Sequence, residues 1–521
     1  METKRKELTM AKNIFISFLG TGHYKECQYD YRLFDGNKRK VTFIQEATLD
    51  YLLSQKKFDD NSIAYILLTG KARESNWDDG YDFELEDGTV ETQEEGLCSR
   101  LEKLKKKKAK EGVVFNYKDI DISDESEKDI WVLFSDLYNL LVKEEQENDI
   151  NLYVDITHSF RYLPMFLIVF INYVKLFKNV TVEHISYGNY EGRDKKTNVA
   201  PIVDLTDYSK LQDWTYAIRS FIESGNANAL VALCNQGNSD LANILNIVVA
   251  DFQTCRSIPI VDGNHIAKLK KEIGKYSSIV NKSIQENESN SDSKITPFNN
   301  ILSELEHQLA VFQRKKVSDE IDTENVTNGY EASIWCFNRQ LYQQAITILQ
   351  ENLITEQCLT DGKYHDFEWK DGYGEGKYHK SIRADIEYED QSLYDIVSNV
   401  RNDFNHAGFS MGTSEQYPNG WEWSKIKKDL IDVFSKLLTK KFNGKKKMTE
   451  KNGFPYIENI NSKSKNKTPE FSNVSTVKKG NQTSTPQKGP EILRTETDKP
   501  KGLSIVGKID LDKIQNNKKR K

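Results

Sequence analysis

A polar cluster late in the chain has the residue types of a proton-transfer and phosphate-binding site. The segment "VRNDFNHAGF", residues 400–409, follows a stretch in which apolar side chains recur at helical spacing. Within it, Arg401, Asn402 and His406 stand close together in the sequence. Histidine exchanges protons near neutral pH, and the guanidinium fork of arginine binds phosphate without losing its charge. These three residues are therefore candidate catalytic residues.

The spacing of Arg401 and His406 limits how they can share a site. At about 100° per residue, five positions leave the two side chains roughly 140° apart around an ideal helix. Asn402 and His406 are four residues apart and share one face. Either the helix is distorted near His406, or two copies of the chain contribute residues across a two-fold axis. The non-catalytic alternative is that Arg401 pairs with Asp395 or Asp403, while His406 stabilises a helix C-terminus.

A second group of candidates lies much earlier, where predicted strands end. Apolar strands at 13–20, 62–70 and 150–156 each lead into a loop of small or polar residues. In an open parallel sheet such loops meet at one edge, where ligands bind, and N–H groups at a following helix start suit phosphate. We predict a ligand site formed by Gly20, Thr21, Gly22, His23, Tyr24, Thr69, Gly70, Thr157, His158, Ser159, Phe160 and Arg161.

No common cofactor motif accompanies these loops. The run "GTGHYK" lacks the third glycine of a G-x-G-x-x-G loop, and no G-x-x-x-x-G-K-[ST] sequence occurs. The alternative for each loop is structural, because glycines turn the chain and hydroxyls cap helices. His158 is equally compatible with a capping or core role. The convergence of three loops on one edge nevertheless favours a ligand site.

The order of elements predicts an α/β domain followed by an all-α region. From 11 to 205, strands alternate with helices, and the central strands are continuously apolar, which is typical of parallel strands covered on both faces. We predict a Rossmann-like parallel-sheet domain at 11–205, a helical linker region at 206–325 and a terminal helical domain at 326–445. A polar insertion occupies 73–100, and the lysine-rich run 103–110 is predicted to be a solvated helix face.

Charge is distributed unevenly over the 521 residues. The net charge of −6 combines +9 from residue 451 onward with −15 in the rest of the chain. An acidic body is a poor general binder of nucleic acid, so nucleic acid would have to bind at a focused site. Residues 446–521 contain five of the ten prolines and many polar residues, and we predict that they form a disordered basic tail.

Targeting and metal-binding signals are not evident in the sequence. The N-terminal segment is charged and lacks the apolar stretch of a signal peptide, and no apolar run has the length of a membrane span. We therefore expect a cytoplasmic protein without a membrane partner. The six cysteines are scattered, with no C-x-x-C pair, and no two histidines have zinc-finger spacing, so we expect reduced thiols and no bound metal.

The two groups of candidates occur together in a known family. The segments "SFLGTGHY" and "DITHSFRYLPMFL" resemble the CARF domain of CRISPR-associated proteins, and "APIVDLTDYSKLQDWTYAIRSF" resembles the exit from that domain. Arg401 and His406, in a helical region, are similar to the HEPN ribonuclease motif. Over residues 11–445 the sequence therefore resembles the CARF–HEPN effectors of type III CRISPR systems.

The resemblance implies a function. In that family a CARF dimer binds a cyclic oligoadenylate, and binding activates a metal-independent endoribonuclease formed by two HEPN domains. It implies a homodimer with cyclic oligoadenylate as allosteric activator, single-stranded RNA as substrate, no catalytic cofactor and a role in antiviral defence. RNA supplies its own 2′-OH nucleophile, so proton transfer and phosphate stabilisation would be enough for cleavage. The alternative is a nucleotide-sensing regulator whose helical domain binds RNA or protein without cleavage.

Overall fold

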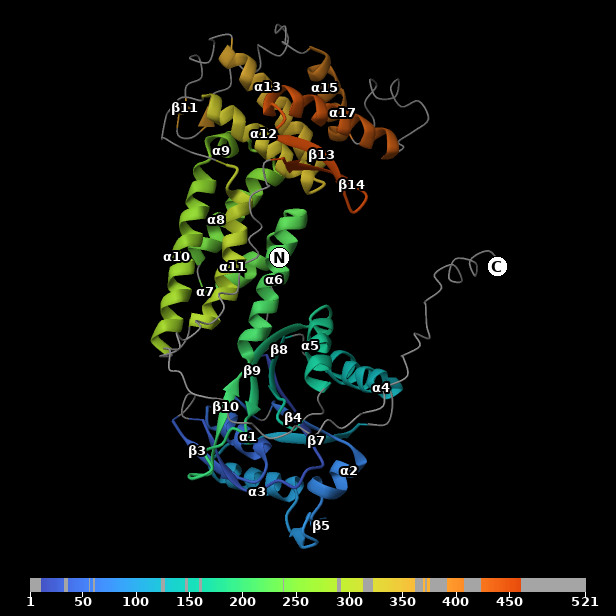
Figure 1. Cartoon of the computed structure of the whole chain (residues 1–521), viewed down its shortest axis with the longest axis vertical. Coiled ribbons are helices and arrows are strands. Elements are labelled where there is room, and N and C mark those ends of the chain that lie inside the picture. The colour runs from blue at the N-terminus through green and yellow to red at the C-terminus, as the bar shows by residue number, and fades with distance from the viewer. Residues whose placement is uncertain are drawn as a thin grey trace, which may run out of the picture. The chain divides into compact units, whose positions relative to one another are not determined.

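An eight-stranded sheet forms the N-terminal part of the protein (Figure 1). The computed structural model describes residues 11–460 except for 32–35, 56, 60, 123–126, 146–148, 159–161, 238, 288–291, 313–321, 361–368, 371–372, 375–390 and 407–422. The strands are β1 (Lys12–Leu19), β2 (Cys27–Asp30), β3 (Lys38–Val41), β4 (Ile63–Leu68), β7 (Asn116–Asp121), β8 (Asp149–Asp155), β9 (Asn179–Gly188) and β10 (Val199–Asp204), in the order β3-β2-β10-β9-β8-β1-β4-β7. β1, β4, β7, β8 and β9 are parallel, whereas β10 is antiparallel to β9. The predicted Rossmann-like α/β fold is confirmed, with one edge that is not parallel.

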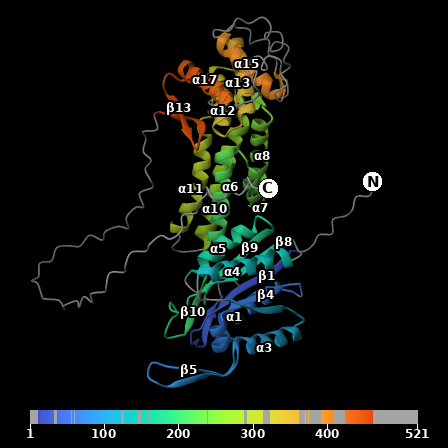
Figure 2. The same cartoon turned by 90° about the vertical axis from the view of Figure 1, so that its right-hand side faces the viewer.

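Helices cover both faces of the sheet (Figure 2). One face carries α1 (Ile44–Ser54) and α3 (Leu97–Lys110), and the other carries α4 (Glu127–Tyr138), its continuation η2 (Asn139–Glu144), and α5 (Leu163–Val174). β1 contributes to both cores: Ile14, Ile16 and Phe18 pack with α4 and α5, while Phe15 and Leu19 pack with α1 and α3. Because successive side chains point to opposite faces and both faces are buried, nearly every position of this strand is apolar.

The chain reverses its direction of travel across the sheet between β1 and β8. Leaving aside the β2–β3 hairpin, which lies beside β10 at the far end of the sheet, the chain moves from β1 outward through β4 to β7. It then returns to β8, which lies on the other side of β1 and is followed by β9. The neighbouring strands β1 and β8 therefore mark the topological switch point of the sheet. Open α/β sheets bind ligands beyond the carboxyl ends of the strands at this point.

The polar insertion at 73–100 contains regular structure. A short helix α2 (Gly70–Ala72) and a π-helix η1 (Arg73–Trp77) follow β4, and a hairpin of β5 (Tyr81–Glu84) and β6 (Val90–Gln93) comes next. Gly88 lies in the hairpin turn with a φ of +79°, a conformation that glycine adopts without strain. The strand that we predicted at 113–117 is β7, which begins three residues later, because this edge strand alternates partly buried and exposed residues instead of being continuously apolar.

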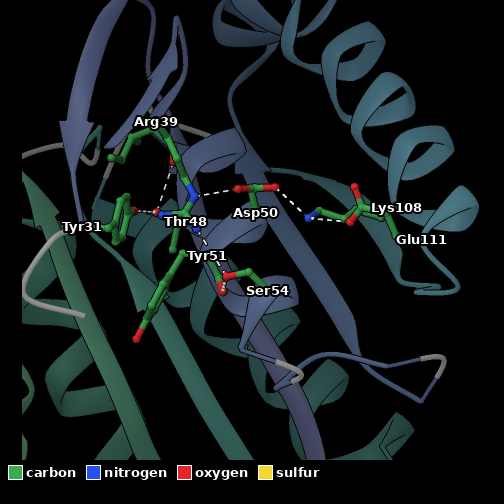
Figure 3. Close-up of polar contacts among 9 residues, drawn as sticks. Tyr31, Arg39, Thr48, Asp50, Tyr51, Ser54, Lys108 and Glu111 are labelled. Carbon is green, nitrogen blue, oxygen red and sulfur yellow. Dashed lines mark hydrogen bonds and ion pairs between the residues drawn. The ribbon is translucent and has the colours of Figure 1, made fainter. Parts of the chain in front are cut away.

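The lysine-rich run of α3 is mostly exposed, as predicted, but Lys108 is buried. Its ammonium lies 3.0 Å from a carboxylate oxygen of Asp50 and 3.0 Å from one of Glu111, and Arg39 donates to Asp50 at 2.6 Å (Figure 3). Burial acts to raise the pKa of Asp50, but the hydrogen bonds from Arg39 and Lys108 outweigh it and lower that pKa. This network joins β3, α1 and α3 on one side of the sheet.

Helices with their own apolar core follow the sheet domain. They are α6 (Thr206–Ser224), α7 (Asn228–Gly237), α8 (Ser239–Gln253), α9 (Ser257–Asp262), α10 (Asn264–Asn287), α11 (Asp292–Leu309), α12 (Thr323–Asn338), α13 (Tyr342–Thr360), α15 (Gln391–Asn405) and α17 (Trp423–Phe442), with two short strands, β11 (Trp369–Lys370) and β12 (Tyr373–Gly374). Buried side chains from Trp214 to Ile457 form one cluster. The predicted all-α region is confirmed, while its division at 325 and its HEPN character remain predictions. Within the described residues, none of the helices combines the length and apolar character needed to cross a bilayer.

The segment that we predicted to be disordered begins with a β-hairpin. β13 (Lys446–Lys451) and β14 (Phe454–Asn459) pair across a turn at Asn452 and Gly453, both of which have positive φ. Asn338 of α12 exchanges two hydrogen bonds of 2.8 Å with the backbone of Ile457. The prediction was wrong here because an Asn-Gly turn and an anchor on α12 outweigh the polar composition. Residues 461–521, the remainder of the predicted tail, lie outside the described residues.

Candidate ligand-binding and nuclease sites

The predicted ligand residues come together at the switch point of the sheet. Residues 20–24, which we call the first loop, follow β1, and residues 156–158, the described part of the second loop, follow β8. An ideal Cβ placed on Gly20 would collide with the Tyr24 hydroxyl and come within 3.0 Å of the His158 carbonyl oxygen. Only glycine therefore permits this contact between the two loops. Ser159, Phe160 and Arg161, the remaining predicted residues of the second loop, lie outside the described residues.

The first loop is fixed by a side chain from the insertion. Asn76, a fully buried residue of η1, donates from Nδ2 to the carbonyl oxygens of Gly20 at 3.0 Å and of Gly22 at 2.9 Å. One amide group thus holds both glycines of the loop. Because each backbone carbonyl is then occupied, the loop has one defined conformation rather than the freedom that two glycines would otherwise allow.

Two aromatic pairs lie on either side of this loop. The ring of Tyr24 lies against that of His158, with the ring centroids 4.0 Å apart, and His23 stacks on Phe83 of the β5–β6 hairpin at 4.5 Å with an interplanar angle of 16°. Burial raises the pKa of the Tyr24 hydroxyl, although hydrogen bonds with the backbone of Gly22 and Gly20 oppose that change. Tyr24 is therefore neutral.

His158 is an uncharged hydrogen-bonding group at this edge. Burial lowers its pKa to about 3, since a charged imidazole would lose its hydration there. Its Nε2 atom is covered and has no hydrogen-bond partner within the described part of the chain. Buried polar atoms usually have a partner, so Nε2 is a candidate contact for a ligand that displaces the groups covering it.

Below the second loop, a buried carboxylate ties three strands together. Asp155 accepts hydrogen bonds from Ser17 of β1 at 2.8 Å and from the Thr157 hydroxyl at 2.6 Å, and that hydroxyl accepts one from the Gly188 N–H of β9 at 2.8 Å. Burial raises the pKa of Asp155 to about 6, despite the opposing hydrogen bonds from Thr157 and Ser17. The Thr157 hydroxyl therefore fixes the second loop to β8 and β9 and is not free to contact a ligand in this conformation.

The third predicted loop has a structural role in this conformation. Thr69 is buried, and its Oγ1 accepts a hydrogen bond from the Ala72 N–H at 3.2 Å, so it caps the short helix α2. Gly70 is exposed, and a Cβ at that position would meet open space. Thr69 is thus a helix cap, as the structural alternative predicted. For Gly70 and the half-buried Thr21, a role in ligand binding remains a prediction.

The candidate nuclease residues lie at the C-terminal end of α15. Arg401 is half-buried and donates from Nη1 to Oδ1 of Asn402 at 3.1 Å, and its Nε is buried without a partner within the described residues. His406 follows the last residue of the helix and is exposed, with its backbone N–H bonded to the carbonyls of Asn402 and Asp403. Within the described part of the chain, no side-chain hydrogen bond joins Arg401 to His406. Asn402 is thus placed to orient Arg401.

Sequence reasoning missed several residues that build the ligand-binding edge. Asn76, Phe83 and Glu91 all come from the insertion at 73–100, for which we predicted no role, and Asp155 was not among the predicted ligand residues. An Asp-Gly turn between alternating apolar and polar residues at 81–93 was the available signal for the hairpin. Nothing in the sequence indicated that its side chains reach the first loop.

The fold and this edge define a class of protein: a Rossmann-like sheet with two ligand-type loops at its switch point, followed by a helical region. Residues 14–191 match the family described as CRISPR system endoribonuclease Csx1, CARF domain. The sheet domain is therefore similar to the CARF domain of that family. The matched residues end before α6, so the helical region is outside this match.

Two individual proteins are similar to this chain. The CRISPR-associated protein MJ1674 of Methanocaldococcus jannaschii is 28% identical over 153 residues, which is 29% of this chain and 22% of that protein. The chain thus matches about a fifth of the length of this relative. The structure of Enterococcus italicus Csm6 bound to cyclic hexa-2′-fluoro-hexa-dAMP aligns with 82% of this chain and 94% of its own, at 12% identity and a TM-score of 0.26. A TM-score this low does not establish a shared fold, and we infer nothing about this chain from it.

Proposed function

We propose that this protein is an endoribonuclease that a cyclic oligoadenylate activates in CRISPR antiviral defence. The observation that carries the proposal is the meeting of the first and second loops around Gly20, at the switch point of a sheet domain similar to the CARF domain. Open parallel sheets bind their ligands at that point. The helical region, with Arg401 and His406 at the end of α15, is then the part that responds to the ligand.

The first and second loops have the chemistry to bind an adenine nucleotide ring. Tyr24 and His158 offer aromatic rings, on which nucleobases stack. The neutral His158 has no partner for Nε2 in the described part of the chain, and it can form a hydrogen bond with a base edge once the ligand displaces the groups that cover this atom. Side chains of His23 and Lys25, next to the glycines of the first loop, can donate hydrogen bonds to phosphate oxygens.

RNA cleavage would use the three residues at the end of α15. The 2′-OH attacks the adjacent phosphorus, and the bond to the 5′-oxygen breaks to leave a 2′,3′-cyclic phosphate. His406 transfers a proton in this step, and Arg401, held by Asn402, stabilises the charge on the phosphate oxygens. Since no step needs a metal ion, cleavage should continue in the presence of EDTA.

A second copy of the chain is expected to complete the nuclease site. α15 is regular to Asn405, so Arg401 and His406 project in different directions from one helix end. A two-fold axis would bring the residues of two such helices together. The proposed activator is a ring of repeated units, which also suits a symmetric dimer.

The α4–α5 surface is a candidate for the contact between the two copies. Aromatic rings such as Phe134 and Tyr173 pack these helices against each other, and the outer side leaves Trp131, Met165 and Val169 exposed by 70%, 69% and 61%. Monomeric proteins rarely expose large apolar patches, and we assign this surface to the homodimer. Val169→Asp should yield monomers in sedimentation experiments, whereas Val90→Asp, at a similarly exposed position on β6, should not. A dimeric Val169→Asp variant would contradict this assignment.

The proposed function is tested by RNA cleavage with and without cyclic tetra-adenylate and cyclic hexa-adenylate. The wild type should cleave single-stranded RNA only with an activator, and His406→Ala should lose at least about a hundredfold of that activity. Undiminished cleavage by His406→Ala would overturn the site assignment. Binding of an activator without cleavage under any condition would favour the alternative, a sensor that regulates a partner.

A further inference from the structure

The β5–β6 hairpin contacts the first loop through one carboxylate. Glu91 Oε2 of β6 lies 3.3 Å from Nε2 of His23 and 3.6 Å from Nζ of Lys25. His23 and Lys25 are side chains near the glycines of the first loop that can donate to an anion. The carboxylate of Glu91 therefore occupies the donors that a phosphate oxygen bound to these two side chains would use.

The structure holds this contact from several directions. The ring of Phe83 stacks on His23 and lies edge-to-face against Tyr81 at 4.8 Å. Across the hairpin the Thr92 hydroxyl donates to Asp82 at 2.6 Å. Because His23 is stacked and the two strands are tied together, the hairpin holds the backbone of Glu91 next to the first loop.

The base of the hairpin is fixed as well. Asp79 accepts hydrogen bonds from the Gly96 N–H and the Ser99 hydroxyl of α3, each at 2.7 Å. η1 reaches the same first loop through Asn76, which holds the carbonyls of Gly20 and Gly22. The insertion therefore binds the backbone of the first loop through Asn76 and contacts the side chains of His23 and Lys25 through Glu91.

The charge of the hairpin excludes a role in attracting phosphate. Residues 78–95 contain nine Asp and Glu and no Lys or Arg. This surface repels an anionic ligand. Such a ligand can bind the side chains of His23 and Lys25 only after the contacts of these side chains with Glu91 break. The contact opposes ligand binding instead of supporting it.

We propose that Glu91 is an internal competitor of the anionic ligand at His23 and Lys25, and that it sets the ligand concentration at which the sheet domain responds. This rests on the proposed function in one respect, namely that the ligand is a cyclic oligoadenylate. A ligand that carries several phosphates in one ring displaces the carboxylate because its other phosphates and bases bind elsewhere on the edge at the same time.

The test compares the dissociation constants of full-length wild type and Glu91→Gln for cyclic tetra-adenylate, cyclic hexa-adenylate and ATP. Glu91→Gln keeps the side-chain shape and removes the charge, so the ligand should bind about three- to fivefold more tightly, the range expected for a partly exposed ion pair. Glu84→Gln removes the same charge from the exposed side of β5 and should change affinity less than twofold. Equal affinities, or weaker binding by Glu91→Gln, would overturn the proposal.

A double-mutant cycle with Lys25→Met checks the mechanism. If Glu91 competes for Lys25, the gain from Glu91→Gln should shrink when Lys25 is absent, and additive effects would contradict the competition. Comparing the three ligands distinguishes failure of this inference from failure of the proposed function. Tighter binding of ATP alone by Glu91→Gln would support the competitor and refute the cyclic ligand, whereas failure of all three probes to bind either protein would refute both.

Discussion

The two candidate sites of this protein are built in opposite ways. At the sheet edge, residues from distant parts of the chain, such as Gly20, Asn76 and His158, are joined by hydrogen bonds and ring contacts within one copy. At the end of α15, Arg401 and His406 are close in sequence, but no hydrogen bond joins their side chains within the described residues. The first site is organised by topology, and we propose that a second copy of the chain completes the second. On this proposal, a ligand can bind before the nuclease site is complete.

The strongest test of this contrast is Arg401→Ala. Loss of a group that stabilises charge on the phosphate should lower the rate of activated RNA cleavage by about 100- to 1000-fold. The dissociation constant for the activator should not change, because the ligand edge does not involve α15. Asn405→Ala, at an exposed position on the same helix end, is the matched control and should retain cleavage. If both variants lose cleavage activity equally, the activity depends on the integrity of the helix end and not on the guanidinium group of Arg401.

Asp155→Asn tests the electrostatics of the sheet edge through pH-dependent stability. The pKa of Asp155 is raised from 3.8 to about 6, so the folded state keeps a proton that the unfolded state releases between these values. This stabilisation is fully present below about pH 3.8 and is lost as the pH rises through about 6. Two pKa units correspond to about 3 kcal/mol.

Urea unfolding of the wild type and Asp155→Asn from pH 4 to pH 8 measures this effect. The unfolding free energy of the wild type minus that of the variant should fall by about 3 kcal/mol between pH 4 and pH 7. Taking the difference between the two proteins removes the titration of the other carboxylates. A difference that is constant over this range would mean that the pKa of Asp155 is not raised by burial.

A smaller effect is expected from closing the gap between the loops. Gly20→Ala places a methyl group against the Tyr24 hydroxyl and the His158 carbonyl, and such overpacking typically costs about 1–3 kcal/mol. Binding of a cyclic oligoadenylate should weaken about tenfold or more. At Gly22 the corresponding Cβ comes no nearer than 3.5 Å to Tyr24, so Gly22→Ala should bind nearly normally. Calorimetric titration measures the dissociation constants of both variants. If ligand binding weakens equally in the two, the close contact at Gly20 is not what limits binding.

The smallest effect concerns the hairpin that ends the described helical region. Asn338→Ala removes both hydrogen bonds to the backbone of the buried Ile457, which should lower the unfolding free energy by about 1–3 kcal/mol. Amide hydrogen exchange should increase in β13 and β14 before it increases elsewhere. If protection of these strands is unchanged, their anchoring to α12 does not depend on Asn338.

Much of the sheet domain could be predicted from the sequence because its signals are local. Runs such as the one over β1 are apolar at nearly every position, since alternate residues face two separate cores. Gly20 and Thr157 follow such runs, and parallel strands bring their ends to one edge. Those two loops could therefore be placed together without a structure, although their role in binding is still a prediction.

The missed features depend on turns and on contacts across the chain. Both hairpins had readable Asp-Gly or Asn-Gly turns, at Gly88 and Gly453, but their polar composition led us to predict a polar insertion and a disordered tail. The contacts of Asn76 and Glu91 with the first loop cannot be read from spacing, because they are set by how η1 and the hairpin pack against the end of β1. Tertiary packing, and not local pattern, determines them.

The most direct test of the central claim is the initial rate of RNA cleavage measured against activator concentration. We predict that cyclic tetra-adenylate or cyclic hexa-adenylate stimulates the wild type saturably. Gly20→Ala should need a higher concentration for half-maximal stimulation and should reach the same maximal rate, since only the ligand edge is altered. Cleavage that is independent of activator, or a Gly20→Ala variant with a lower maximal rate and an unchanged half-maximal concentration, would contradict a sensor edge that controls a separate nuclease site.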